Sequence, residues 1–247
     1  RSCLVGSEMC IRDRASIGEK VSTSAAIYKV PANGITIDTD LIVPSMVPLL
    51  DFGQEDIDKV VANVEGGVSN IQDMYPLSPL QEGMYFHHLM SNKEEGDPYV
   101  LPSLLSFSNK ENRALFVEAL QSVVNRHDVL RTCILSKDLP SAVQVVLREA
   151  ILSVENLAFD NSEDILSELK ILASPDNQWI DVSKAPLITL KSADDLENNC
   201  YYLIFLAHHL VLDHVGLEKI IVEVEMQASG KGVNLPVSTL YLSLIHI

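Results

Sequence analysis

The sequence feature that constrains the fold most is an apolar run that ends in a cluster of polar residues. Residues 201–207 read Tyr-Tyr-Leu-Ile-Phe-Leu-Ala, and residues 208–214 read His-His-Leu-Val-Leu-Asp-His. Such a short apolar run predicts a buried strand, and a strand end is a rigid place from which to present a side chain. The chain has seven histidines in all, so three of them in one cluster indicate a candidate site.

Composition disfavours several classes of function. The formal net charge is −16, and both nucleic acid and an anionic membrane would repel such a chain. No run of about 18 apolar residues exists, so we predict no membrane span. The cysteines lack zinc-site or disulfide spacing, so we expect no metal, reduced thiols and a cytoplasmic location. These cysteines are Cys3, Cys10, Cys133 and Cys200.

Helical and strand patterns alternate along the chain, which predicts an α/β or α+β fold. Helices are predicted where apolar residues recur at helical spacing, and strands where short apolar stretches lie between turn residues. Ser78 followed by Pro79 predicts a helix start. The predicted helices cover residues 54–64, 79–89, 110–126, 162–173 and 217–227. The predicted strands cover residues 100–107, 132–135, 142–148, 187–191 and 201–207.

The ends of the chain differ in character from its middle. Residues 15–69 contain prolines and turn-forming pairs, and we predict an extended linker with one short helix there. Residues 70–241 carry the regular pattern of a folded lobe. Residues 1–14 and 242–247 resemble translated sequencing-adaptor reads, so we expect both stretches to be artefacts.

The polar cluster has side chains suited to proton transfer. An imidazole titrates near neutrality and can accept a proton from an amine or a hydroxyl. Asp213 follows His209 by four residues, so one turn of chain can bring the two together. A buried aspartate needs a cationic partner, for which Arg131 is a candidate. The competing interpretation is a set of polar residues that only cap a strand end.

Three motifs resemble those of the condensation domains of nonribosomal peptide synthetases. Residues 208–213 are similar to the HHxxxDG motif of that family. Residues 75–84 (Tyr-Pro-Leu-Ser-Pro-Leu-Gln-Glu-Gly-Met) and 126–132 (Arg-His-Asp-Val-Leu-Arg-Thr) resemble two further motifs, in the family's order. The resemblance covers roughly residues 70–230. It implies a fold like chloramphenicol acetyltransferase, of which only the N-terminal lobe, a mixed sheet flanked by helices, is expected here.

A fourth motif resembles a particular subtype. His87-His88-Leu-Met is followed by Gly96-Asp97, similar to the extra histidine motif of dual epimerization/condensation domains. Such domains invert the α-carbon of the upstream residue and then form the peptide bond. One position departs from the family pattern, because His214 stands where the HHxxxDG motif has glycine.

The resemblance also implies roles for individual residues. His209 is expected to be the central imidazole, which either takes the proton of the acceptor amine or orients that amine. Asp213 is expected to hold the loop, and His208 or His214 to assist in epimerization. His87 and His88 are expected to have a supporting or structural role.

The substrates implied by the resemblance are thioesters on the phosphopantetheine arms of carrier proteins, with no cofactor bound directly. The implied partners are the upstream and downstream carrier domains, an adenylation domain and the missing C-terminal lobe of the same synthetase. Three alternatives remain open: condensation without epimerization, another acyltransferase of the same superfamily, and a non-catalytic lobe that docks a carrier. With half of the cleft missing, the fragment alone is expected to be inactive.

Overall fold

The computed structural model describes residues 33–92, 94, 96–159, 164–174, 178–232 and 235. The artefacts predicted at 1–14 and 242–247, and the first part of the predicted linker, lie outside these residues. The helical elements are η1 (Pro44–Met46), α2 (Gln54–Ala62), η2 (Gly67–Asn70), α3 (Pro79–Met90), α4 (Lys110–Arg126), η3 (Asp128–Arg131), α5 (Ile165–Leu172) and α6 (His214–Ala228). The strands are β1 (Ile71–Pro76), β2 (Val100–Phe107), β3 (Thr132–Leu135), β4 (Val143–Leu147), β5 (Val154–Asn156), β6 (Ile188–Asp195) and β7 (Cys200–His208).

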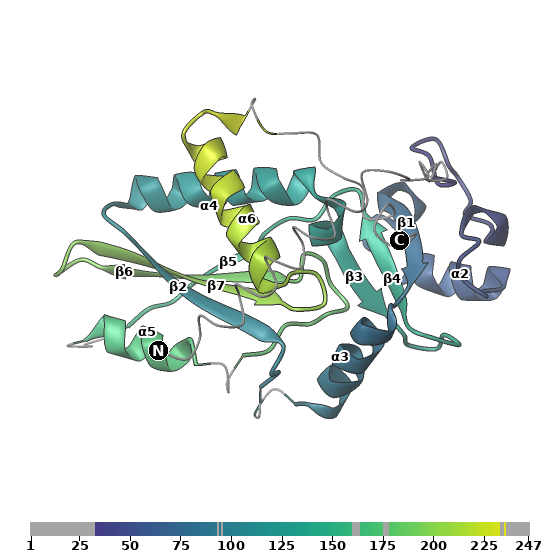
Figure 1. Ribbon diagram of the computed structural model, residues 1–247, viewed down its shortest axis with the longest axis horizontal. Helices are drawn as coiled ribbons and strands as arrows, with labels where there is room; N and C mark the ends of the chain where they lie inside the picture. The colour runs from purple at the N-terminus through teal and green to yellow at the C-terminus, as the bar shows by residue number, and fades with distance from the viewer. Residues whose placement is uncertain are drawn as a thin grey trace, which may run out of the picture. The chain divides into compact units, whose positions relative to one another are not determined.

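The strands form two sheets, a four-stranded sheet in the order β2-β7-β6-β5 and a three-stranded sheet in the order β1-β4-β3 (Figure 1). All neighbours are antiparallel except β5, which runs parallel to β6. Residues 202–208 of β7 are all buried, so side chains on both faces of this strand are covered. The apolar run therefore forms the buried strand that its composition predicts.

Helices flank the four-stranded sheet on both sides. In Figure 1, α4 and α6 lie on one side of this sheet and α5 lies on the other. The inner face of α4 consists of Ala119, Leu120, Val123 and Val124. Glu223 of α6 accepts hydrogen bonds from Arg126 Nε at 3.1 Å and His127 Nε2 at 2.8 Å, which fixes α6 to the end of α4. The mixed sheet with flanking helices is the architecture that the sequence predicts.

The bounds of α4, β2 and β3 agree with the predictions to the residue. The closing helix differs, because α6 begins at His214 rather than at residue 217. Asp213 is its N-cap, and its carboxylate accepts the Gly216 N–H at 2.6 Å. Strands β1 and β5 have no counterpart among the predicted strands. The first lacks strict polar–apolar alternation and ends in a proline, and the second has only three residues, all exposed.

The segment predicted as an extended linker, residues 15–69, is packed rather than extended over its described part, residues 33–69. Its α2 confirms the short helix predicted there. Eight of its apolar side chains belong to the same buried core as β7, among them Ile35, Ile42, Val47, Phe52 and Ile57. The first four have neither helical nor strand spacing, so periodicity gives no sign of their burial.

Among the described residues, no helix is both long enough and apolar enough to cross a lipid bilayer.

Candidate active site

Three segments that are distant in sequence meet at the end of β7. In the pairing of β2 with β7, Val100 lies opposite His208, so residues 97–99 lie beside the histidine cluster. The N–H of His209 donates to the Tyr99 carbonyl at 2.8 Å. The third segment is the last turn of α3, which carries His87 and His88. The strand register therefore brings the two histidine pairs together.

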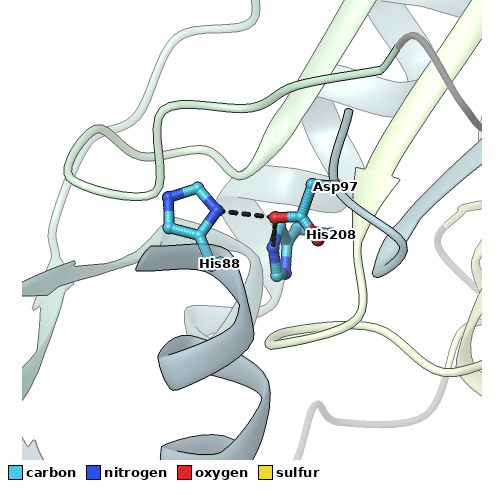
Figure 2. A group of neighbouring side chains, drawn as sticks. All are labelled: His88, Asp97 and His208. Atoms are coloured by element: carbon cyan, nitrogen blue, oxygen red, sulfur yellow. Dashed lines mark hydrogen bonds and ion pairs between the residues drawn. The ribbon is translucent and has the colours of Figure 1, made fainter. Parts of the chain in front are cut away.

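A buried carboxylate joins one histidine of each pair. Asp97 is 1 % exposed, and its Oδ2 atom accepts hydrogen bonds from His88 Nδ1 at 2.6 Å and from His208 Nε2 at 3.0 Å (Figure 2). Its Oδ1 atom accepts the Tyr99 N–H at 2.9 Å. Burial alone raises the pKa of Asp97, but the hydrogen bonds from His208, His88 and Tyr99 hold that pKa well below its usual range. The group is therefore an ionised carboxylate within the core.

The hydrogen bonds also define the protonation state of His208. Its Nδ1 atom accepts the N–H of Leu210 at 3.1 Å, so the ring proton resides on Nε2, which donates to Asp97. A ring that accepts at one nitrogen and donates at the other is neutral. His208 thus connects Asp97 to the backbone of the loop that carries His209.

The three side chains His88, Asp97 and His208 offer donor atoms within 4.8 Å of one another, the donor set of a transition-metal site. Metal binding through Nε2 of His208 would require the proton of that ring on Nδ1. That position faces the N–H of Leu210, and two donors would then point at each other. The hydrogen bonds therefore favour a carboxylate shared by two imidazoles over a metal centre.

Further contacts enclose this buried group. The indole of Trp179 stacks on His88, with ring centroids 4.2 Å apart and an interplanar angle of 25°. The N–H of Asp97 donates to the Gln178 carbonyl at 2.7 Å. Gln81 of α3 donates to the Leu210 carbonyl at 3.0 Å, which ties the helix to the loop at residues 209–212 that follows β7. The sequence alone assigned no role to Trp179, Gln178, Gln81 or Asp97, although Gln81 and Asp97 belong to motifs that resemble those of the family.

A second, more exposed layer lies beside the buried one. In this layer four rings follow one another. The distances between ring centroids are 5.9 Å from His87 to Tyr99, 6.5 Å from Tyr99 to His209 and 5.5 Å from His209 to His214. Burial, followed by the neighbouring imidazoles of His214 and His208, lowers the pKa of His209. The ring is therefore neutral near pH 7, the form that accepts a proton.

The structure separates the two histidines that the sequence grouped in a supporting role. His88 is buried and belongs to the Asp97 group, whereas His87 is exposed and contacts the rings of Phe86 and Tyr99. Adjacent residues near the end of a helix point about 100° apart, so one faces the core and the other faces outwards.

The predicted ion pair between Asp213 and Arg131 is wrong. The Asp213 carboxylate is exposed and caps α6, a role for which aspartate is among the preferred residues. Arg131 is buried in η3, where it donates to Gln72 Oε1 at 3.0 Å and to the carbonyls of Leu147 and Arg148. Among the described residues, no ion pair joins Asp213 to a lysine or an arginine. Asp213 and Arg131 thus bind to other partners instead of to each other.

Comparison with protein families gives a match to the condensation domain over residues 71–232. The chain belongs to the condensation-domain family. The match includes the whole site, from His87 to His214, and confirms the family resemblance of the sequence motifs.

Two similar relatives are the malpibaldin and malpinin synthetases of Mortierella alpina. The chain is 40 % identical to malpibaldin synthetase over 93 % of its own length, and 42 % identical to malpinin synthetase over 87 %. Tyrocidine synthase 2 of Brevibacillus parabrevis is 30 % identical over 58 % of the chain. The chain spans only 4 %, 3 % and 4 % of these three proteins respectively.

Solved condensation-domain structures share the fold at low sequence identity. The starter condensation domain of the rhizomide synthetase superimposes with a TM-score of 0.55 at 17 % identity, over 70 % of this chain and 44 % of the other. A four-domain nonribosomal peptide synthetase gives a TM-score of 0.52 at 16 % identity, over 64 % of this chain and 12 % of the other. These likenesses confirm the predicted fold class.

Proposed function

We propose that the chain is the N-terminal lobe of a nonribosomal peptide synthetase condensation domain, which forms a peptide bond between two carrier-bound thioesters. The observation that carries this proposal is the placement of His209. It stands at the end of a buried strand, half-buried, with a lowered pKa. A neutral imidazole on a rigid support is the group needed to accept a proton from an attacking amine.

In the proposed reaction the acceptor amine attacks the thioester carbonyl carbon, and His209 takes the proton that the amine loses. The carbon–sulfur bond then breaks and the thiol of the donor arm leaves with a proton. A thioester is already activated, so most of the rate enhancement comes from holding amine and carbonyl in line. The phosphopantetheine arms are parts of the substrates, supplied by the partner carrier domains.

The same site is proposed to epimerize the upstream residue before condensation. A thioester acidifies the neighbouring α C–H, and a base that removes this proton and returns it to the other face inverts the centre. His209 is the proposed base, with His208 in the supporting position described above. Residues 87–97 support this epimerization proposal. They form the motif that resembles the dual epimerization/condensation subtype, and their Asp97 contacts His208 of the proposed catalytic motif.

Product stereochemistry tests the epimerization proposal. The full-length protein that carries this sequence is supplied with an L-aminoacyl upstream carrier and a loaded downstream carrier, and the released dipeptide is resolved by chiral chromatography. We expect a D-configured upstream residue. A product that is only L-configured would retain condensation and reject epimerization, and a parallel reaction with a D-aminoacyl carrier controls for stereochemical selectivity in the condensation step. Absence of any peptide from the wild type would reject the whole proposal.

The domain division of the sequence belongs to the same proposal: a segment over residues 15–69 that follows a carrier domain, the lobe over 70–241, and artefacts at 1–14 and 242–247. The described part of the first segment, residues 33–69, packs into the core of the lobe. The solved starter condensation domain of the rhizomide synthetase is more than twice as long as the portion matched here, since that portion is 44 % of it. We therefore expect the 247-residue chain alone to form no peptide bond with both loaded carriers. Mass spectrometry of the carrier-bound products measures this. Turnover by the isolated chain would show that one lobe suffices.

A further inference from the structure

We infer that Asp97 is a positioning residue that fixes the catalytic loop, residues 209–212, through His208. We infer also that His88 acts on the reaction through this carboxylate. The inference rests on the proposed function of His209, whose position the loop sets. It gives the motif at residues 87–97 a physical role that does not require contact with substrate.

Three hydrogen-bond donors converge on Asp97. Its carboxylate accepts from His88 Nδ1, His208 Nε2 and the Tyr99 N–H at 2.6, 3.0 and 2.9 Å. A carboxylate accepts on both oxygens, whereas an asparagine amide has one oxygen and one NH₂ group. An asparagine NH₂ group would face the Tyr99 N–H in one orientation, and both His88 and His208 in the other. Only an ionised acid satisfies all of them.

Hydrogen bonds connect Asp97 to the backbone around His209. The Nε2 hydrogen bond of His208 to Asp97 leaves Nδ1 free to accept the Leu210 N–H at 3.1 Å. The His209 N–H is held by the Tyr99 carbonyl at 2.8 Å, and Tyr99 is in turn tied to Asp97. The backbone on both sides of the His209 side chain is therefore fixed by bonds that begin at one carboxylate.

His88 supports the Asp97 carboxylate in two ways. Its ring is buried against Trp179 and donates to Asp97, so it supplies a donor and a packed surface. The exposed His87 makes no hydrogen bond to Asp97 among the described contacts. The two histidines of the motif thus differ in function, and the donor of His88 is the one that matters for the loop.

The test uses the full-length protein with Asp97→Asn, His88→Asn and His88→Leu. An asparagine amide nitrogen lies at the same distance along the side chain as histidine Nδ1, so His88→Asn keeps the donor to Asp97 but cannot transfer a proton. We expect Asp97→Asn to lower kcat about 10²-fold, the scale of a small misplacement of a catalytic group, with KM for both carriers unchanged. We expect His88→Asn to keep most of the wild-type kcat, and His88→Leu to fall towards the Asp97→Asn value.

Hydrogen–deuterium exchange measured by mass spectrometry gives a readout that is independent of activity. In Asp97→Asn, exchange should rise in the peptide that covers residues 208–212 and stay unchanged in β4. A general loss of stability would raise exchange in both. His209→Ala should lose activity with the exchange of the loop intact, so a failure of the proposed function can be told apart from a failure of this inference. Unchanged exchange at 208–212 in Asp97→Asn, or a His88→Asn variant as slow as His88→Leu, would overturn the positioning role.

Discussion

Replacement of His209 by alanine is expected to lower the rate of peptide-bond formation by about 10²–10⁴-fold, the usual contribution of a general base. The reason is the placement of the ring at the end of β7, with a pKa lowered by burial and by neighbouring imidazoles. The measurement is single-turnover peptide formation by the full-length protein with both carriers loaded. A variant within a few-fold of the wild type would remove His209 from the mechanism.

The variant His209→Asn distinguishes the two roles considered for this ring. Asparagine retains an N–H donor of similar position but cannot accept a proton at neutral pH. If His209 acts as a base, His209→Asn is as slow as His209→Ala. If the ring mainly orients the amine, the asparagine variant recovers part of the rate. The lowered pKa of His209 further predicts that the acidic limb of the wild-type pH–rate profile lies below the ordinary histidine value of about 6.5.

Replacement of His208 by leucine is expected to destabilise the fold by about 3–5 kcal/mol at pH 7, because removal of one partner leaves a buried charge incompletely compensated. His208 is fully buried, and its loss removes a donor to Asp97 and an acceptor for the Leu210 N–H. Urea unfolding of the 247-residue chain measures the free energy of unfolding. Leu203→Ala, also fully buried in β7, is the matched control, with an expected cost of about 2–5 kcal/mol from lost packing.

The pH dependence of these two variants should differ. In the wild type the folded pKa of Asp97 is depressed, so its stabilising contribution is present above the unfolded aspartate pKa of about 3.9 and is lost as the pH falls below that value. In His208→Leu one of the hydrogen bonds that lower the Asp97 pKa is lost. The effect of burial then dominates more, and the pKa of Asp97 in the folded state rises. Protonation then relieves the buried charge. The cost of His208→Leu should therefore shrink between pH 7 and pH 4, whereas the cost of Leu203→Ala should stay constant. A constant cost for both would contradict the role of Asp97 as the buried anion.

The fold was predictable where one physical signal dominates a segment. Helix α4 has a regular apolar face and an asparagine cap at Asn109, and both signals lie within the segment itself. Strand β1 and the packed segment at 33–69 were not predicted, because their burial depends on partners elsewhere in the chain. Local periodicity carries no information about such partners.

The candidate site divides in the same way. The apolar run singled out the cluster at residues 208–214, and the resemblance to the dual epimerization/condensation motif singled out His87 and His88. The sequence also led to a pairing of Asp213 with Arg131 that the fold does not make. For Asp213 the local cap of α6 is available within three residues, and short-range hydrogen bonds of this kind compete well with distant ion pairs.

The resemblance of three short motifs indicated the family. Residue type and spacing indicated the buried strand at 201–207 and the histidine chemistry at its end, because these properties are local to the chain. The junction of His88 with His208 through Asp97 became visible only in three dimensions. His208 lies 111 residues beyond Asp97, and their contact depends on the register in which β2 pairs with β7. A shift of that register by one residue would turn the paired side chains to the opposite face of the sheet. Long-range strand pairing therefore converts two separate histidine motifs into one site.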